Sequence, residues 1–139
     1  MPVLTIALIL FIWGHSMMPG EVSGEESGIV ADFLRSLFSL EMEDLDHIVR
    51  KCAHFTEYAV LGAIIMLDTL VLAKRFFHMA ALFTGLFVPV VDETIQIFAV
   101  DRSGVLTDVW LDFFGFITGL ALCALICGTV IKRKGIEIS

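Results

Sequence analysis

Basic residues are few in this sequence: nine lysines and arginines stand against sixteen aspartates and glutamates, giving a formal net charge of −7. This balance excludes the basic surface of a nucleic-acid-binding protein, and the cations form no polybasic segment that would bind anionic lipids. The acids are unevenly placed, since eight of the sixteen lie between Glu21 and Asp46. We therefore expect one acidic segment and no nucleic-acid partner.

Several catalytic motifs are also missing. The sequence contains no glycine-rich phosphate loop, no HExxH and no GxSxG, which excludes the familiar nucleotide-binding, zinc-protease and serine-hydrolase patterns. Its three cysteines, Cys52, Cys123 and Cys127, form no CxxC motif and lie in or beside apolar runs. We expect them to be small buried residues rather than disulfide or metal partners.

Apolar residues dominate what is present. They make up 58% of the 139 residues, and the mean hydropathy is +0.89. Such values are typical of an integral membrane protein, and the length suits one domain without a separate soluble domain. The pattern predicts an all-α bundle of four transmembrane helices, the first of them near the lower length limit for a span. The expected spans are residues 3–18, 49–73, 76–100 and 107–131.

One long polar segment, residues 21–49, separates the first two expected spans. Residues 21–27 read as a loop, with Ser27 as the N-cap of a short amphipathic helix over residues 29–38. The apolar residues of that helix recur at steps of three and four. We expect this outer helix to pack over the end of the bundle with its apolar face, in preference to lying in the lipid headgroups.

Four spans would place both termini on the same side of the membrane. Cations at Lys74 and Arg75 and at residues 132–134 mark that side as cytoplasmic. Both termini are therefore expected in the cytoplasm, and the opposite ends of the helices are expected to face outside.

Ionisable residues gather at those opposite helix ends. Arg50, His54 and Glu57 share one helical face, and Asp108 and Asp112 share another. Such groups are costly at membrane depth and usually face a bundle interior or a wet cavity. They could act only as polar contacts between helices, but such contacts contribute well under about 1 kcal/mol on average. We therefore predict a functional polar site.

The residue types indicate an acid–base site that binds an anion. His54 is the best general base or nucleophile, with Glu57 one turn away to orient it. The carboxylates could hold sugar hydroxyls or a divalent cation, although no spacing is diagnostic and the metal stays unknown. We assign to catalysis His54, Glu57, Glu93, Asp108 and Asp112. We assign to substrate binding His15, Arg50, Lys51, Asp92, Gln96 and Arg102.

Two glycines in the last expected span, Gly115 and Gly119, form a GxxxG pattern on the face that carries Asp108 and Asp112. Because that face is expected to point inward, we predict close helix packing inside the bundle rather than dimerisation.

Four motifs resemble the VanZ-like family of small bacterial membrane proteins, in its order and spacing and over most of the chain. They are HSMMPG (15–20), RKCAHFTEYAVLG (50–62), DETIQIF (92–98) and RSGVLTDVWLDFFGFITG (102–119). One mild departure is AVDRSG (99–104), where the family commonly has a proline before the arginine. The family is named after a member associated with resistance to the glycopeptide teicoplanin, and a relation to membrane enzymes acting on lipid head groups has been proposed. Its matching positions are the eleven residues assigned above.

The resemblance and the residues together favour an enzyme that modifies a phosphate-linked lipid or cell-envelope precursor at the outer leaflet. The alternative is a non-enzymatic membrane protein that binds an envelope lipid or antibiotic and lowers drug access. A transporter is third, because four spans without an inverted repeat do not suit one. The oligomeric state does not follow from the sequence.

Overall fold

The computed structural model describes residues 2–38, 45–73, 79–100, 102 and 104–134. Within these residues the structure is helical and has no strand, which confirms the predicted all-α class. The elements are α1 (Pro2–Ser16), α2 (Gly20–Phe38), α3 (Leu45–Asp68) with a π-helical extension η1 (Thr69–Ala73), α4 (Met79–Phe98) and α5 (Leu106–Lys134).

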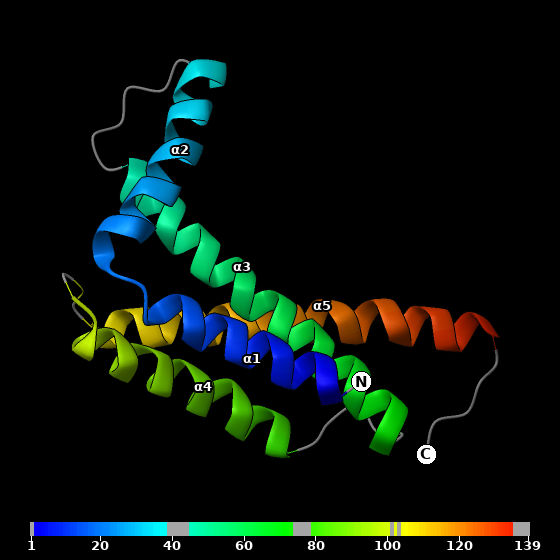
Figure 1. Ribbon diagram of the computed structural model, residues 1–139. Coiled ribbons are helices and arrows are strands. Elements are labelled where there is room, and N and C mark those ends of the chain that lie inside the picture. Colours follow the sequence, from blue (N-terminus) through cyan, green and yellow to red (C-terminus); the bar gives the residue numbers. More distant parts are fainter. Residues whose placement is uncertain (1, 39–44, 74–78, 101, 103, 135–139) are drawn as a thin grey trace.

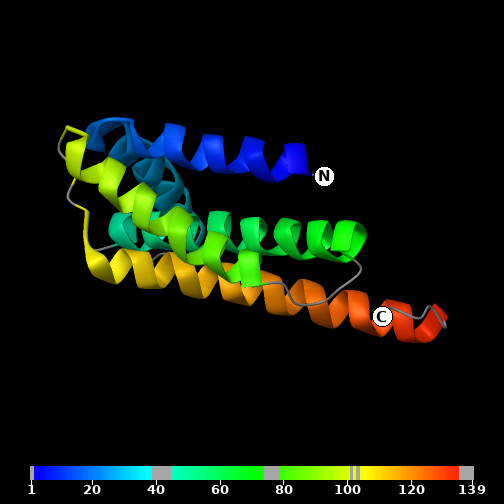
Figure 2. The same cartoon turned by 90° about the horizontal axis from the view of Figure 1, so that it is seen from below.

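Four helices form the bundle, and α2 projects from it beside the start of α3 (Figure 1). Helices α1 and α4 run in one direction and α3 and α5 in the other, so the start of α1 and the end of α5 lie at the same end. Figure 2 shows α3 between α1 and α5, with α4 crossing beside them. This alternation brings four polar helix ends together at the other end of the bundle.

The tightest packing joins α3 to α5 through glycines. A Cβ atom on Gly115 would collide with the Phe55 carbonyl, and one on Gly119 with the Ala59 carbonyl. From the side of α3, a Cβ atom on Gly62 would collide with the backbone of α5. The GxxxG pattern therefore permits close packing inside the bundle, as predicted.

Helix α1 is attached to the other helices by packing and by hydrogen bonds at two levels. Ile12 is buried in the core cluster with Tyr58 and Phe116. Trp13 Nε1 donates to the Val88 carbonyl at 3.3 Å. Further along, Thr5 Oγ1 donates to Asp68 Oδ2 at 2.6 Å.

Helix α2 differs from the prediction in its extent and in its buried face. It begins at Gly20, directly after Pro19, so residues 21–27 are helical and not a loop. Ser27 is not an N-cap: its hydroxyl donates to the Ser23 carbonyl at 2.9 Å. The helix packs on α3 by small residues, whereas Ile29, Phe33 and Leu37 are 71%, 63% and 60% exposed. The expectation that the apolar face packs on the bundle is therefore wrong, because small side chains allow the closer approach.

Among the described residues, three helical segments are long and apolar enough to cross a membrane: Leu45–Leu72, Met79–Phe98 and Leu106–Arg133. At 15 residues, α1 is about 22 Å long, short of a hydrocarbon core of about 30 Å. Helices α1 and α2 together pass as a fourth, broken span or a re-entrant loop, bent by 105°. The protein is thus a multi-pass membrane protein with three to four spans.

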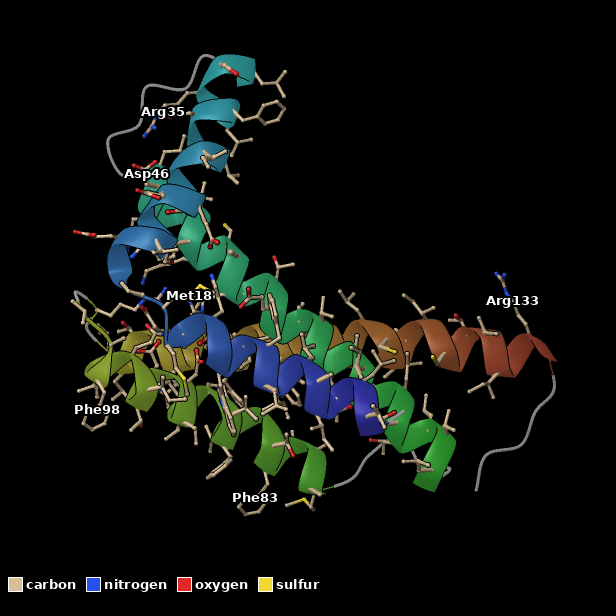
Figure 3. All side chains as sticks on the ribbon, in the orientation of Figure 1. Met18, Arg35, Asp46, Phe83, Phe98 and Arg133 are labelled. Atoms are coloured by element: carbon tan, nitrogen blue, oxygen red, sulfur yellow. The ribbon has the colours of Figure 1, made fainter. Side chains whose placement is uncertain are left out.

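The outer surface of the bundle suits lipid. Phe83 and Phe98 point away from it on α4 (Figure 3) and are 72% and 84% exposed. The three cysteines are free, as expected, but they are not buried: Cys52 is exposed and Cys123 and Cys127 are intermediate.

Candidate functional site

Two cavities lie at the polar end of the bundle. The first, called the polar cavity, has a volume of about 230 Å³ and lies between α3, α4 and α5. Its lining residues are His47, Arg50, Lys51, His54, Glu93, Gln96, Arg102, Val105, Asp108, Leu111 and Asp112. The second, called the apolar cavity, has a volume of about 620 Å³ between α1, α2 and α3. Arg50 and His54 line both cavities.

The three cations of the polar cavity differ in their partners. Lys51 Nζ donates to Asp108 Oδ1 at 2.7 Å, joining α3 to the first turn of α5. Within the part of the chain that the structure describes, Arg50 Nε is buried without a hydrogen-bond partner, as are Nε and Nη2 of Arg102. Burial first, and then the charge of Arg50, lowers the pKa of Arg102. Arginine still keeps its charge near neutral pH, so both guanidinium groups can bind an anion.

His54 faces a carboxylate from another helix. Its Nδ1 lies 4.0 Å from Oδ1 of Asp112, and the Asp112 side chain is 1% exposed. Neither carboxylate oxygen of Asp112 has a hydrogen-bond partner. At 4.0 Å the two groups are not hydrogen-bonded, but the negative charge of a carboxylate at this distance favours the protonated ring that a general base forms.

Glu57 pairs with His15, whereas the sequence had suggested it as the partner of His54. Its Oε1 is 4.0 Å from His15 Nδ1, and His15 Nε2 lies 3.0 Å from Glu26 Oε2. These three residues line the apolar cavity, not the polar one. Among the described residues no ion pair joins Glu57 to His54, and the carboxylate next to that imidazole is Asp112.

Helix α4 contributes three buried polar side chains. Gln96 Nε2 donates to Asp92 Oδ2 at 3.3 Å, whereas Asp92 Oδ1 has no partner. Glu93 Oε2 accepts a hydrogen bond of 2.8 Å from the Val105 amide, directly before α5. Glu93 therefore fixes the start of α5 relative to α4, which is a structural role beside its predicted catalytic one.

Two of the carboxylates expected to be able to hold a metal ion, Asp92 and Asp112, lie close to His54. His54, Asp92 and Asp112 each offer one ligand atom, and these atoms lie within 4.8 Å of one another. Asp108, one turn before Asp112, is instead paired with Lys51. Glu93 is engaged by the Val105 amide.

Comparison with known proteins identifies the family of the chain. The family model described as VanZ/LLP1 matches residues 2–127. The chain belongs to the VanZ/LLP1 family. No curated protein and no solved structure matches the chain. Ten of the eleven polar residues assigned from the sequence line one or both cavities, and the eleventh, Asp92, is fully buried.

In this VanZ/LLP1 protein, three polar residues beside the site were missed by the site assignment. Tyr58, the single tyrosine, is fully buried one turn after His54, and its hydroxyl has no hydrogen-bond partner. Ser16 is 1% exposed, and its hydroxyl also lacks a partner. His47 lines the polar cavity. Helical spacing could have found Tyr58 and His47, which continue the His54 face in both directions.

Proposed function

We propose that this protein binds a phosphate-linked membrane lipid or lipid-linked envelope precursor and modifies its head group. The observation that carries the proposal is the pair of cavities sharing Arg50 and His54. One cavity is polar and holds three cations beside three carboxyl groups. The other is larger, and its wall includes the apolar side chains of Leu10, Phe11, Val30 and Val49. An amphiphile with an anionic head and an apolar chain suits both at once.

The charged groups support an anionic head group. Arg50 and Arg102 have buried N–H groups without acceptors, which costs free energy unless an acceptor is supplied. Phosphate oxygens are good acceptors for guanidinium forks. Lys51 is held by Asp108, so we assign it to positive charge at the rim rather than to direct binding.

The reaction that suits these residues is hydrolysis or transfer at phosphorus. In the hydrolytic form, His54 takes a proton from water, the water oxygen forms a bond to phosphorus, and the bond to the leaving oxygen breaks. The proton returns from the imidazolium to the leaving oxygen, so the imidazole ends the cycle neutral. Asp112, 4.0 Å from Nδ1, stabilises the imidazolium between these steps.

We place this site at the outer leaflet of a bacterial membrane, with both termini in the cytoplasm. Support comes from the cations Lys132 and Arg133, which lie near the end of α5 opposite the cavities; Figure 3 labels Arg133. Cations flanking a span favour the cytoplasmic side. A lipid-linked envelope precursor displayed outside would reach the cavities from the membrane.

A second candidate function is binding without chemistry. The apolar cavity has more than twice the volume of the polar one, which favours retention of a hydrophobic chain. Such a protein could bind an envelope lipid or a lipophilic antibiotic and lower drug access, in line with the teicoplanin resistance of the family's namesake.

One assay separates the two functions. The purified protein, reconstituted in nanodiscs, is incubated with extracted envelope lipids and the lipids are analysed by mass spectrometry. An enzyme yields a new species whose mass differs by the head-group change, and the amount grows with time. A binder retains an unchanged lipid, and no species grows with time. That second result would reject the enzyme.

A further inference from the structure

We propose that His54, Asp92 and Asp112 form a binding site for one divalent transition-metal ion, such as Mn²⁺ or Zn²⁺, between α3, α4 and α5. The inference adds an ion to the same polar site. It rests on the proposed function only for the substrate, because ion binding itself is measurable without any lipid. With the ion bound, His54 would be a ligand without a free lone pair, so it could not also be the base proposed above.

The ligand atoms are already gathered. One imidazole nitrogen and one oxygen from each aspartate lie within 4.8 Å of one another. Around an ion with bonds of about 2.1 Å, ligands lie about 3.0–4.2 Å apart. Small side-chain rotations are therefore enough to close the site, and no helix has to move. Imidazole with carboxylates is a donor set that suits Mn²⁺ and Zn²⁺.

The second observation is the state of the two carboxylates. Asp92 and Asp112 are both fully buried. Both oxygens of Asp112 and Oδ1 of Asp92 have no hydrogen-bond partner. Asp112 has no hydrogen-bond partner among the described residues, and Asp92 has as polar neighbours Gln96 and the hydroxyls of Ser16 and Tyr58, all of them neutral. Two buried carboxylates without a cationic partner are costly in a membrane bundle, and one divalent cation would neutralise both. Gln96 donates to Oδ2 of Asp92 at 3.3 Å and leaves Oδ1 for an ion. A hydrogen bond to the other oxygen commonly orients a carboxylate that binds a metal.

The competing explanation for the two carboxylates is Arg102. Its Nε and Nη2 are buried and also lack partners, so a rotation of Arg102 could satisfy the carboxylates without any ion. The two explanations predict opposite effects when the arginine is removed. If the carboxylates bind an ion, the protein should bind it both with and without Arg102. If Arg102 is their native partner, only the Arg102→Gln variant should bind the ion.

The test uses full-length protein in nanodiscs, stripped with a chelator and titrated with Mn²⁺, the unbound ion being counted by its EPR signal. We expect one Mn²⁺ per chain. Asp112→Asn and Asp92→Asn should each weaken binding on the order of a hundredfold. Asp108→Asn is the matched control, because Asp108 lies one turn away on α5 and is paired with Lys51; it should bind Mn²⁺ like the unchanged protein.

The shift in Tm on adding the ion is a second measurement, which can be used if a variant folds poorly. A bound ion should raise the Tm of the unchanged protein and of Asp108→Asn, and leave that of His54→Gln and Asp112→Asn unmoved. Absence of Mn²⁺ and Zn²⁺ binding at millimolar concentration would overturn the proposal, as would equal loss in Asp108→Asn. If only Arg102→Gln binds the ion, Arg102 is the native partner and the proposal is wrong. If the protein binds Mn²⁺ but changes no lipid, the proposed ion site stands and only the proposed enzymatic function is rejected.

Discussion

Asp112 Oδ1 lies 4.0 Å from His54 Nδ1, although the two residues come from different helices and from opposite halves of the chain. Their proximity follows from the glycines that come next on α5. Gly115 and Gly119 bring its backbone against the carbonyls of Phe55 and Ala59 on α3. The packing of two helices thus positions the imidazole and the carboxylate of the candidate site.

A first prediction tests that packing. Gly119→Ala should lower the free energy of unfolding by about 1–3 kcal/mol, because its Cβ would collide with a backbone carbonyl that cannot turn away. Gly28→Ala is the matched control, since nothing lies within 4 Å of its Cβ position on α2, and alanine there should be neutral or stabilise by about 0.5–1 kcal/mol. Thermal unfolding in one detergent measures both. Equal stability of the two variants would show that the glycines are not needed for the approach.

The second prediction concerns orientation. A cysteine replacing Glu25, which is exposed on α2, should react with an impermeant thiol reagent on intact cells, and one replacing Gly135 should not. Ser23 is unsuitable for this purpose because it is 4% exposed. The native cysteines are replaced first, since Cys52 is exposed. Labelling of the second variant alone would place the cavities on the cytoplasmic side and contradict an outer-leaflet substrate.

A third prediction assigns anion binding to Arg102. Arg102→Gln should weaken binding of a phosphate-linked lipid about tenfold or more, because it removes a charge-assisted pair. Although burial and Arg50 lower the pKa of Arg102, arginine stays charged at neutral pH, so the contribution of Arg102 should be constant from pH 6 to 8.

Native mass spectrometry of the lipid complex measures this effect. Arg35→Gln is the control: Arg35 pairs with Asp32 and Asp46 at the far end of α2, outside both cavities (Figure 3). Unchanged lipid binding in Arg102→Gln would remove this residue from the anion site.

Helical periodicity predicted the class, three of the four expected spans approximately, and the inward glycine face; the first expected span is too short to cross alone. It also predicted that the polar residues lie at one end of the bundle. Successive spans run in opposite directions, so the polar end of each helix comes out on the same side. What it could not provide is the neighbour of each side chain. Glu57 shares a face with His54 on a helical wheel, yet in three dimensions it lies beside His15. The glycine contacts decide that α5 places Asp112 next to His54 instead.

Helix α2 shows a different limit. Glycine and serine in residues 21–27 indicate a loop when only local propensity is considered. In the structure these residues are helical, and the small side chains of Ser23, Ser27 and Ala31 allow the helix to lie against α3. Tertiary packing overrides a weak local preference here, and it also leaves Phe33 exposed, which the apolar spacing alone had placed inward.

The central claim, that His54 acts as the base in a reaction on a phosphate-linked lipid, is tested most directly by one measurement: the rate of head-group change in extracted envelope lipids, followed by mass spectrometry for the unchanged protein and for His54→Gln in matched nanodiscs. We predict measurable turnover by the unchanged protein. For His54→Gln we predict a rate reduced on the order of a hundredfold or more, with the same Tm and the same membrane insertion. Full turnover by a stable His54→Gln variant, or no turnover by the unchanged protein, would contradict the account.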